Sequence, residues 1–392
     1  MKILYVVSRP LEINTSASIR NRATILGLVD NGHEVEVLTT EPDRNHPAFD
    51  GQMSVDDVAR MHYVKLGGSQ RIARMGRKFS FLRPIKDFAY RWMTRHEIYD
   101  NLKGIVAYTD AISLQNAQYD LIISSSDPKS SHLFVMKLLE KQKEAFQGNW
   151  IQIWGDPFLA DITQTNKNSK LIKAEERRLI HAADLVFYVS RLTMNQQKML
   201  YPEYSRKMRY TPIPYIEEHL TKNRKLSAST ELNLAYCGDY SPTVRNLVPL
   251  YDTVNNNAGL RLVICGDSTE PLSNTQNVVV RGRVSFETVR SVENEADILV
   301  FLANRKGAQI PGKIYQYAGT NKPVLFILDG DENSLKEQFE HYGRFIFTRN
   351  TSVDILQALR YMISNDIEYK PLKDFSKEYI MEQFMIEVEE SV

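Results

Sequence analysis

The chain has 392 residues, of which 43% are hydrophobic and 25% are charged, a composition typical of soluble globular proteins that excludes a disordered or fibrous chain. Its 49 lysines and arginines nearly balance its 48 aspartates and glutamates, so the overall charge does not indicate a nucleic-acid partner. The sequence has two cysteines, Cys237 and Cys265, which excludes a disulfide scaffold and a cysteine-rich zinc module. The length predicts two domains. Because no apolar run is long enough for a signal peptide or a membrane span, we expect a cytoplasmic protein.

The first part of the chain alternates between strand and helix patterns. The apolar run at residues 3–7 predicts a strand, the spacing of apolar residues at 19–28 predicts a helix, and residues 34–38 predict the next strand. Strands that alternate with helices form a parallel sheet, and ligands of such sheets bind at the carboxyl ends of the strands. Ser126 and Asp127 follow one of these ends and are candidate acceptor or loop contacts. Further strands are predicted at 119–124, 149–154 and 183–190.

A linker-like stretch at residues 205–231 separates this series from a second alternating series. We therefore predict the α/β class with two doubly wound, Rossmann-like domains, residues 1–212 and residues 213–375. A final helix at 376–392 has an apolar face and is assigned to pack back on the first domain, although either domain could receive it. The strands predicted in the second series are 232–237, 260–265, 278–280, 298–302, 324–327 and 345–347.

A short helix that opens with Pro311 and runs straight into a strand carries the sharpest local signal. Gly312 lets a backbone approach a ligand closely, and the free N–H groups of the first turn attract an anion such as a diphosphate. Lys313 adds a positive charge at the same end, and Gln316, one turn further on, can reach a sugar hydroxyl. The alternative is an ordinary short helix between two strands.

Three segments, which follow one another along the chain in the same order as in the family, resemble family 4 glycosyltransferases. Residues 311–324 resemble the nucleotide-sugar signature P-x-K-x-x-E-Y-x-x-x-G-K-P-V, residues 31–39 resemble the GHEV-x-V-L-T strand, and residues 183–190 resemble the A-D-x-V-x-x-x-S strand. The resemblance covers most of the chain. It implies the GT-B fold, in which two Rossmann-like domains face each other across a cleft, and a transfer that needs no metal and retains the anomeric configuration.

The resemblance also implies donor-binding residues in the second domain. Gly238 takes the place of a glycine-rich turn after the first strand of that domain, and Arg245 takes the place of the cation that holds the diphosphate. Asp239 stands where many members have an arginine, so one phosphate cation is missing, and Lys313 or Arg283 is the candidate to replace it. Without the other motifs, Arg245 would be read as a solvated residue at a helix start.

Two departures concern the glutamates of the family signature. Ala308 and Gln316 occupy their positions. Gln316 keeps an acceptor oxygen for the ribose but loses the charge. The contact to the transferred sugar is lost at Ala308 or moves to Gln309. These replacements imply an unusual donor or a reduced activity.

In the first domain, residues 154–158 resemble the R-D-P-W segment of a subgroup of these enzymes. The resemblance implies that Asp156 lies beside the transferred sugar, although an aspartate before a proline also suits a helix cap. His132 is a candidate for donor or acceptor binding, with a structural role as the alternative. Ser16 and Ser18 occupy the loop in which relatives have glycines that approach the phosphates.

Residues 65–95 hold nine lysines or arginines against one acid, interleaved with aromatic residues. This pattern predicts peripheral contact with an anionic membrane or binding of a lipid-diphosphate acceptor, and a solvated helical hairpin is the alternative. Nothing else in the chain supports a nucleic-acid partner. No arrangement of metal ligands occurs in the sequence, so we expect neither a metal nor another cofactor.

Together these features predict a glycosyltransferase that moves a sugar from a nucleoside diphosphate sugar to a glycan or lipid-linked acceptor in bacterial polysaccharide synthesis, at the inner face of the membrane. One alternative is a nucleotide-sugar 2-epimerase on the same fold. Another is a non-catalytic nucleotide-sugar-binding subunit, because both signature glutamates are replaced. The base, the sugar and the linkage stay open.

Overall fold

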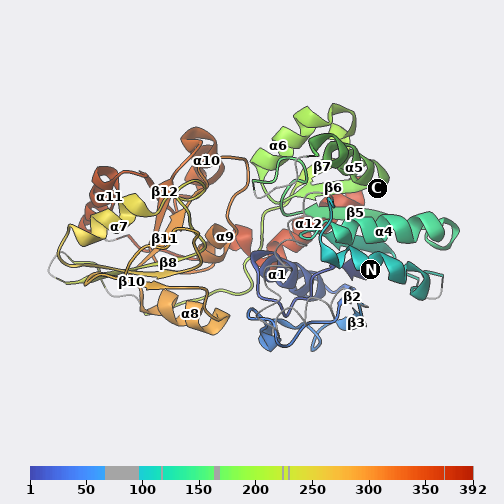
Figure 1. The fold of residues 1–392 in the computed structure, drawn as a ribbon, viewed down its shortest axis with the longest axis horizontal. Helices are drawn as coiled ribbons and strands as arrows, with labels where there is room; N and C mark the ends of the chain where they lie inside the picture. The colour runs from blue at the N-terminus through green and yellow to red at the C-terminus, as the bar shows by residue number, and fades with distance from the viewer. Residues whose placement is uncertain are drawn as a thin grey trace, which may run out of the picture. The chain divides into compact units, whose positions relative to one another are not determined.

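The structure is a computed structural model that describes residues 1–66, 97–115, 118–162, 168–222, 225–227, 230–365 and 367–391. The chain divides into two compact units, one formed by residues 1–212 with 380–392 and the other by residues 213–379. Each unit contains a sheet of parallel strands with helices packed on it (Figure 1). The predicted pair of Rossmann-like α/β domains is therefore confirmed.

The first unit has a seven-stranded sheet in the order β3-β2-β1-β4-β5-β6-β7, and every pairing in it is parallel. From β1 the chain builds outward first to β2 and β3 and then, on the other side of β1, to β4. The carboxyl ends of β1 and β4 are therefore the switch point at which open α/β sheets bind ligands. The strands are β1 (Lys2–Val6), β2 (Glu34–Thr40), β3 (Arg60–Val64), β4 (Leu121–Ser125), β5 (Asn149–Trp154), β6 (Leu185–Tyr188) and β7 (Met208–Tyr210).

Capping side chains fix where the helices of the first unit begin. Thr15 accepts a hydrogen bond from the Ser18 N–H and starts α1 directly behind the loop that follows β1, and Ser190 caps α6 in the same way. Trp150 and Trp154 of β5 are fully buried in the core between sheet and helices. Within the described part of this unit, the helices are α1 (Ser16–Asp30), α4 (Ser130–Lys141), α5 (Ser169–Ala182) and α6 (Arg191–Leu200), and the 3-10 segments are η1 (Gly51–Met53), η3 (Asn101–Ala111), η4 (Lys143–Ala145) and η5 (Pro202–Lys207).

The second unit has a six-stranded parallel sheet in the order β10-β9-β8-β11-β12-β13. Its switch point lies between the carboxyl ends of β8 and β11. Cys237 and Cys265 are paired in register at the ends of β8 and β9, and both are buried free thiols. The strands are β8 (Leu232–Cys237), β9 (Leu260–Cys265), β10 (Val278–Arg281), β11 (Ile298–Leu302), β12 (Val324–Leu328) and β13 (Ile346–Arg349).

The predicted short helix is α9, with six residues, and it ends at Gly319. A Cβ on Gly319 would lie 2.7 Å from Cγ of Tyr215, so the ring of Tyr215 packs on the bare backbone at this helix end. The helices of this unit are α7 (Val248–Asn255), α8 (Phe286–Glu295), α9 (Lys313–Ala318), α10 (Glu332–Phe339) and α11 (Ser352–Ser364), with 3-10 turns η6 (Glu340–Tyr342) and η7 (Lys373–Phe375).

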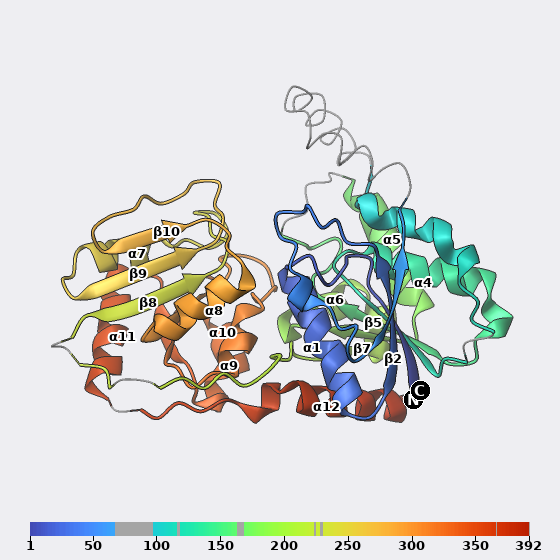
Figure 2. The same ribbon diagram turned by 90° about the horizontal axis from the view of Figure 1, so that it is seen from below.

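The last helix, α12 (Lys377–Ser391), joins the first unit from residue 380 onward (Figure 2). The ring centroids of Phe384 and Phe187 lie 4.4 Å apart, and Arg209 forms an ion pair with Glu387 at 2.8 Å. Apolar packing and one ion pair thus attach the end of the chain to the edge of the first sheet.

Among the helices that the structure describes, none has the length and apolar character to cross a membrane. Residues 67–96, which make up most of the basic segment at 65–95, lie outside the described residues. Membrane contact through this segment and a cytoplasmic location therefore stay predictions.

Candidate functional site

The carboxyl edge of the first sheet is lined with small polar groups at its switch point. The loop after β1 is tied to the start of α4, since Oγ of Ser131 accepts from the Ser8 N–H at 2.9 Å. The loop after β4 is tied to the end of β5, since Oγ of Ser126 accepts from the Gly155 N–H at 3.2 Å. Ser126 is fully buried. These bonds fix the backbone at the edge where the ligand of an open sheet binds.

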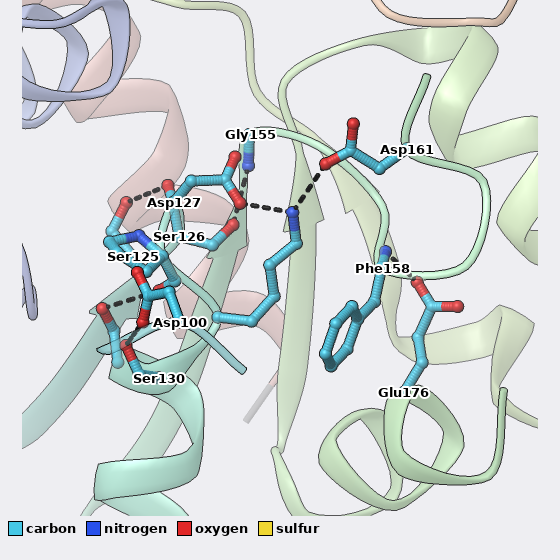
Figure 3. Close-up of polar contacts among 12 residues, drawn as sticks. Asp100, Ser125, Ser126, Asp127, Ser130, Gly155, Phe158, Asp161 and Glu176 are labelled. Carbon is cyan, nitrogen blue, oxygen red and sulfur yellow. Dashed lines mark hydrogen bonds and ion pairs between the residues drawn. The ribbon is translucent and has the colours of Figure 1, made fainter. Parts of the chain in front are cut away.

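A buried lysine connects two acidic loops at this edge. Lys129 forms ion pairs with Asp127, which follows β4, and with Asp161, which follows β5, the latter at 3.2 Å. Figure 3 shows Asp127 and Asp161 on opposite sides of the shared cation. Burial opposes the charges, but the attraction between them lowers the pKa of Asp127 and raises that of Lys129. Both side chains are therefore ionised at neutral pH.

Asp156 belongs to the same cluster and differs from its neighbours in protonation. Burial, followed by the charge of Asp127, raises the pKa of Asp156 to about 7. A carboxyl group with this pKa can release or take up a proton near neutral pH, which is what an acid or base in catalysis requires. Lys129 partly offsets the rise.

Glu176 of α5 supports the segment that follows Asp156. Its carboxylate accepts from the N–H groups of Phe158 at 2.6 Å and Leu159 at 3.3 Å, and from the hydroxyl of Tyr201 at 2.8 Å. The bond to Phe158 is drawn in Figure 3. The side chain is fully buried, so Glu176 holds the backbone of the loop and does not face solvent.

The side chain of His132 is packed in the core. The residue is fully buried, its ring stacks on Trp154 with centroids 4.6 Å apart, and Nδ1 lies 2.8 Å from the Ser124 hydroxyl. Burial lowers its pKa to about 3, so the ring is neutral at physiological pH. This packing favours the structural alternative, and we keep Asp156, not His132, in the proposed reacting centre.

The two serines predicted at the loop after β1 lie in different environments. Ser16 is exposed at the first turn of α1. The Ser18 hydroxyl is buried and donates to the carbonyl of Ile13 at 2.6 Å. Ser18 therefore closes its own loop, and Ser16 is the one of the pair whose side chain faces solvent.

In the second unit, the switch point brings Gly238, behind β8, and Asn304, behind β11, to the same edge. Nη1 of Arg245 lies 3.6 Å from the place where a Cβ on Gly238 would stand. Among the described residues, Nε of Arg245 and Oδ1 of Asn304 are buried without a hydrogen-bond partner, while Nδ2 of Asn304 donates to the carbonyl of Gln309 at 2.8 Å. Unsatisfied buried groups of this kind are expected where a ligand supplies the missing partner.

The two cations predicted to replace the missing phosphate contact already have acidic partners. Arg283 pairs with Asp239 at 2.5 Å and with Asp267 at 3.3 Å, and Lys313 pairs with Glu293 of α8 at 2.6 Å. An incoming diphosphate would compete with these carboxylates. Arg245 has no such ion pair among the described residues, which makes it the stronger phosphate candidate.

The remaining donor candidates lie at the start of α9. Nε2 of Gln316 donates to the carbonyl of Pro214 at 3.1 Å, so part of the amide already holds the chain segment at the start of this unit. A Cβ on Gly312 would lie 3.3 Å from Cδ1 of Ile213, a tight contact that a small shift of the Ile213 side chain would relieve. Ala308 is buried.

Sequence reasoning missed Lys129, Asp161 and Glu176, and the local sequence carries no signal for them, because each acts through a partner from another loop. Resemblance singled out Asp156. Among the described residues, no group of histidine, cysteine, aspartate and glutamate side chains is arranged to hold a metal ion.

A scan against models of protein families and a search of curated proteins gave no match to this chain. Solved structures do match it. The lipopolysaccharide outer core galactosyltransferase WaaB in its apo form aligns with a TM-score of 0.59 at 14% identity over 100% of both chains. HepE from Anabaena in complex with UDP-glucose aligns with a TM-score of 0.60 at 12% identity, also over 100% of both chains.

A UDP-N-acetylglucosamine 2-epimerase aligns over 99% of this chain and 95% of its own, with a TM-score of 0.55 at 10% identity. Identities this low show the fold and leave the activity to be tested. Because the likeness to WaaB and HepE extends over the whole chain, we conclude that this protein has the GT-B fold, two Rossmann-like α/β domains in one chain, in common with these structures.

Proposed function

We propose that the protein is a retaining, family 4-like glycosyltransferase that moves a sugar from a nucleoside diphosphate sugar to a glycan or lipid-linked acceptor. The observation that carries the proposal is the full-length GT-B fold, shared with a galactosyltransferase and with a protein solved with UDP-glucose. The sequence resemblance at residues 311–324 points to the same class.

In this proposal the second domain binds the donor. Arg245 contacts the diphosphate beside Gly238, because its guanidinium fork matches phosphate oxygens and its buried Nε has no partner among the described residues. Asn304 and the backbone at Gln309 stand at the same sheet edge and contact the transferred sugar. Gly312 lets the backbone approach the donor closely.

The first domain then supplies the acceptor side and the reacting group. The bond between the anomeric carbon and the diphosphate oxygen breaks, a bond to the acceptor oxygen forms, and the acceptor hydroxyl loses a proton. Asp156 takes up this proton, because its pKa of about 7 leaves it partly ionised at neutral pH. The charge that develops on the leaving diphosphate is stabilised by Arg245. Ser16 and Asp127 are the acceptor-side candidates, whereas the fully buried Ser126 holds the Gly155 N–H.

The first experiment is a thermal-shift panel of UDP-, GDP-, ADP- and CMP-linked sugars with the full-length chain. A ligand that binds the native state raises the melting temperature, by an amount that grows with its concentration relative to Kd. We expect one nucleotide to stabilise the protein. No shift with any donor at millimolar concentration would count against the proposal.

The second experiment compares Arg245→Ala with Arg261→Ala. Arg261 lies on β9 of the same domain and pairs at the surface with Glu231. We expect Arg245→Ala to reduce transfer about a hundredfold and to melt like the wild type, while Arg261→Ala keeps the activity. Equal activity in the two variants would remove Arg245 from the donor site.

The epimerase is a second candidate because a UDP-N-acetylglucosamine 2-epimerase shares the fold and because Asp127 and Asp156 form a carboxyl pair at the sheet edge. Epimerisation gives a changed sugar nucleotide without any acceptor. Incubation with the stabilising donor alone, followed by separation of the sugar nucleotides, distinguishes the two reactions.

A further inference from the structure

Arg20, in the second turn of α1, is a buried cation that the proposed function leaves without a role. The residue is only 5% exposed, and its Nε and Nη2 have no hydrogen-bond partner among the described residues. No described carboxylate forms an ion pair with it. A buried guanidinium in this state is costly, because these two nitrogens have lost water and gained no acceptor in return. A ligand that supplies the acceptor would offset this cost.

The guanidinium of Arg20 lies against the backbone at the carboxyl end of β5. A Cβ on Gly155 would stand 2.1 Å from Nη1 and 3.0 Å from Nη2 of Arg20, so a glycine is required for the guanidinium to occupy this place. The Gly155 N–H is itself held by Ser126. Arg20 is thus fixed at the polar edge of the first sheet, where open α/β sheets bind their ligands.

The acids of this edge already have another cation. Lys129 pairs directly with Asp127 and Asp161, and Arg20 acts on Asp127 only as a weaker, longer-range charge. Among the described residues, Asp127 and Asp161 are therefore already engaged by Lys129 and form no ion pair with Arg20.

We propose that Arg20, seated against Gly155, binds a phosphate group of the substrate. The planar fork of a guanidinium matches two oxygens of a phosphate. This inference rests on the proposed function, in which phosphate comes from two sources, the diphosphate of the donor and the phosphate of a lipid-linked acceptor.

The test is calorimetric binding to the full-length chain with two pairs of probes. A comparison of the affinities for UDP and uridine reports binding of the donor phosphates. A comparison of the affinities for octyl phosphate and octanol reports binding of a phosphate on the acceptor. We expect the wild type to bind at least one phosphate probe more tightly than its phosphate-free counterpart. Arg20→Met should weaken the binding of that probe about ten- to a hundredfold, the usual effect of losing a charge-assisted pair. The affected probe identifies the source of the phosphate.

Two further variants separate a binding role from a structural one. Gly155→Ala keeps the charge of Arg20 but displaces its guanidinium, so this variant should also bind the same probe more weakly. Arg22→Met is the matched control, because Arg22 lies on the same helix and its Nε donates to the carbonyl of Ser54 at 3.5 Å; it should bind both probes like the wild type. Arg20→Met should melt at the same or a higher temperature than the wild type, because the cation it removes has no partner.

Unchanged binding of both phosphate probes by Arg20→Met overturns the proposal, and so does a wild type that binds neither probe. A lower melting temperature as the only effect of Arg20→Met overturns it too. These failures differ from failure of the proposed function. If Arg20→Met transfers sugar as well as the wild type, the proposed function stands and the Arg20 phosphate site is rejected. If the wild type binds octyl phosphate through Arg20 but binds no nucleotide sugar, the Arg20 site stands and the proposed function is rejected.

Discussion

The buried carboxylate of Glu176 gives the most direct test of how the first domain holds Asp156 in place. Replacement by alanine removes the acceptor of three hydrogen bonds, from Phe158, Leu159 and Tyr201. Phe158 is buried, so its N–H is left without water or another acceptor, whereas the Tyr201 hydroxyl can still donate to the carbonyl of Lys173 at 3.3 Å. At about 1–3 kcal/mol for the stranded donor of Phe158 and about 1 kcal/mol for the hydrogen bond that Tyr201 loses, we expect Glu176→Ala to lower the free energy of unfolding by about 2–4 kcal/mol.

The assay is urea unfolding of the full-length chain. The unfolding of the first domain is monitored by the fluorescence of its buried tryptophans, Trp150 and Trp154. Glu176→Gln keeps one acceptor oxygen and should cost about 1–3 kcal/mol. Arg177→Ala on the same helix removes an exposed side chain and should leave the transition where it is. In a Tyr201→Phe background Glu176→Ala should cost less, because one of the three hydrogen bonds to the carboxylate is already absent. A Glu176→Ala midpoint equal to that of the wild type would refute the reasoning.

Three further predictions follow from single contacts. The pKa of Asp156 is raised from 3.8 to about 7, so its contribution to stability is complete below the unfolded pKa and is lost as the pH rises through 7. The stability of the wild type relative to Asp156→Asn, measured in urea, should therefore fall by about 4 kcal/mol between pH 4 and pH 8, and a rise would contradict the assignment. Phe384→Ala should cost about 3–5 kcal/mol of unfolding free energy, because Phe384 is buried on α12, whereas Ile386→Ala on its exposed face should cost far less. Asp239→Asn should release Arg283 from its 2.5 Å ion pair and tighten UDP binding about two- to tenfold in calorimetry; weaker binding would show that the carboxylate itself helps to bind the ligand.

The sheets were predictable from the sequence because most of their strands are buried on both faces and appear as continuous apolar runs. β11 (Ile298–Leu302) and β12 (Val324–Leu328) are examples in which every residue is buried. β3 and β7 were missed for the opposite reason. They are the edge strands of the first sheet. The residues of β3 (Arg60–Val64) are mostly exposed or half-buried, and β7 spans only three residues inside the predicted linker.

From strand positions alone, the candidate site was predictable where a residue lies within two positions of a strand end, as Asp127, Asp156 and Gly238 do. Strand ends meet at one sheet edge whatever the side chains are, so position alone indicates a binding edge. The ion pair between Lys129 and Asp161 joins positions 32 residues apart, and no periodicity in the sequence encodes such a pairing. Resemblance supplied the candidate roles, but it could not show which cations the protein's own acids already occupy.

That distinction decides which cations can bind phosphate at low cost. Lys129, Arg283 and Lys313 each have an acidic partner, so a phosphate must replace a contact that is already formed. Arg20 and Arg245 each have a buried Nε without a partner among the described residues, and a phosphate oxygen there adds a charge-assisted bond and breaks none. Removing Arg20 or Arg245 should therefore weaken the binding of a phosphorylated ligand to its own domain more than removing a paired cation of that domain.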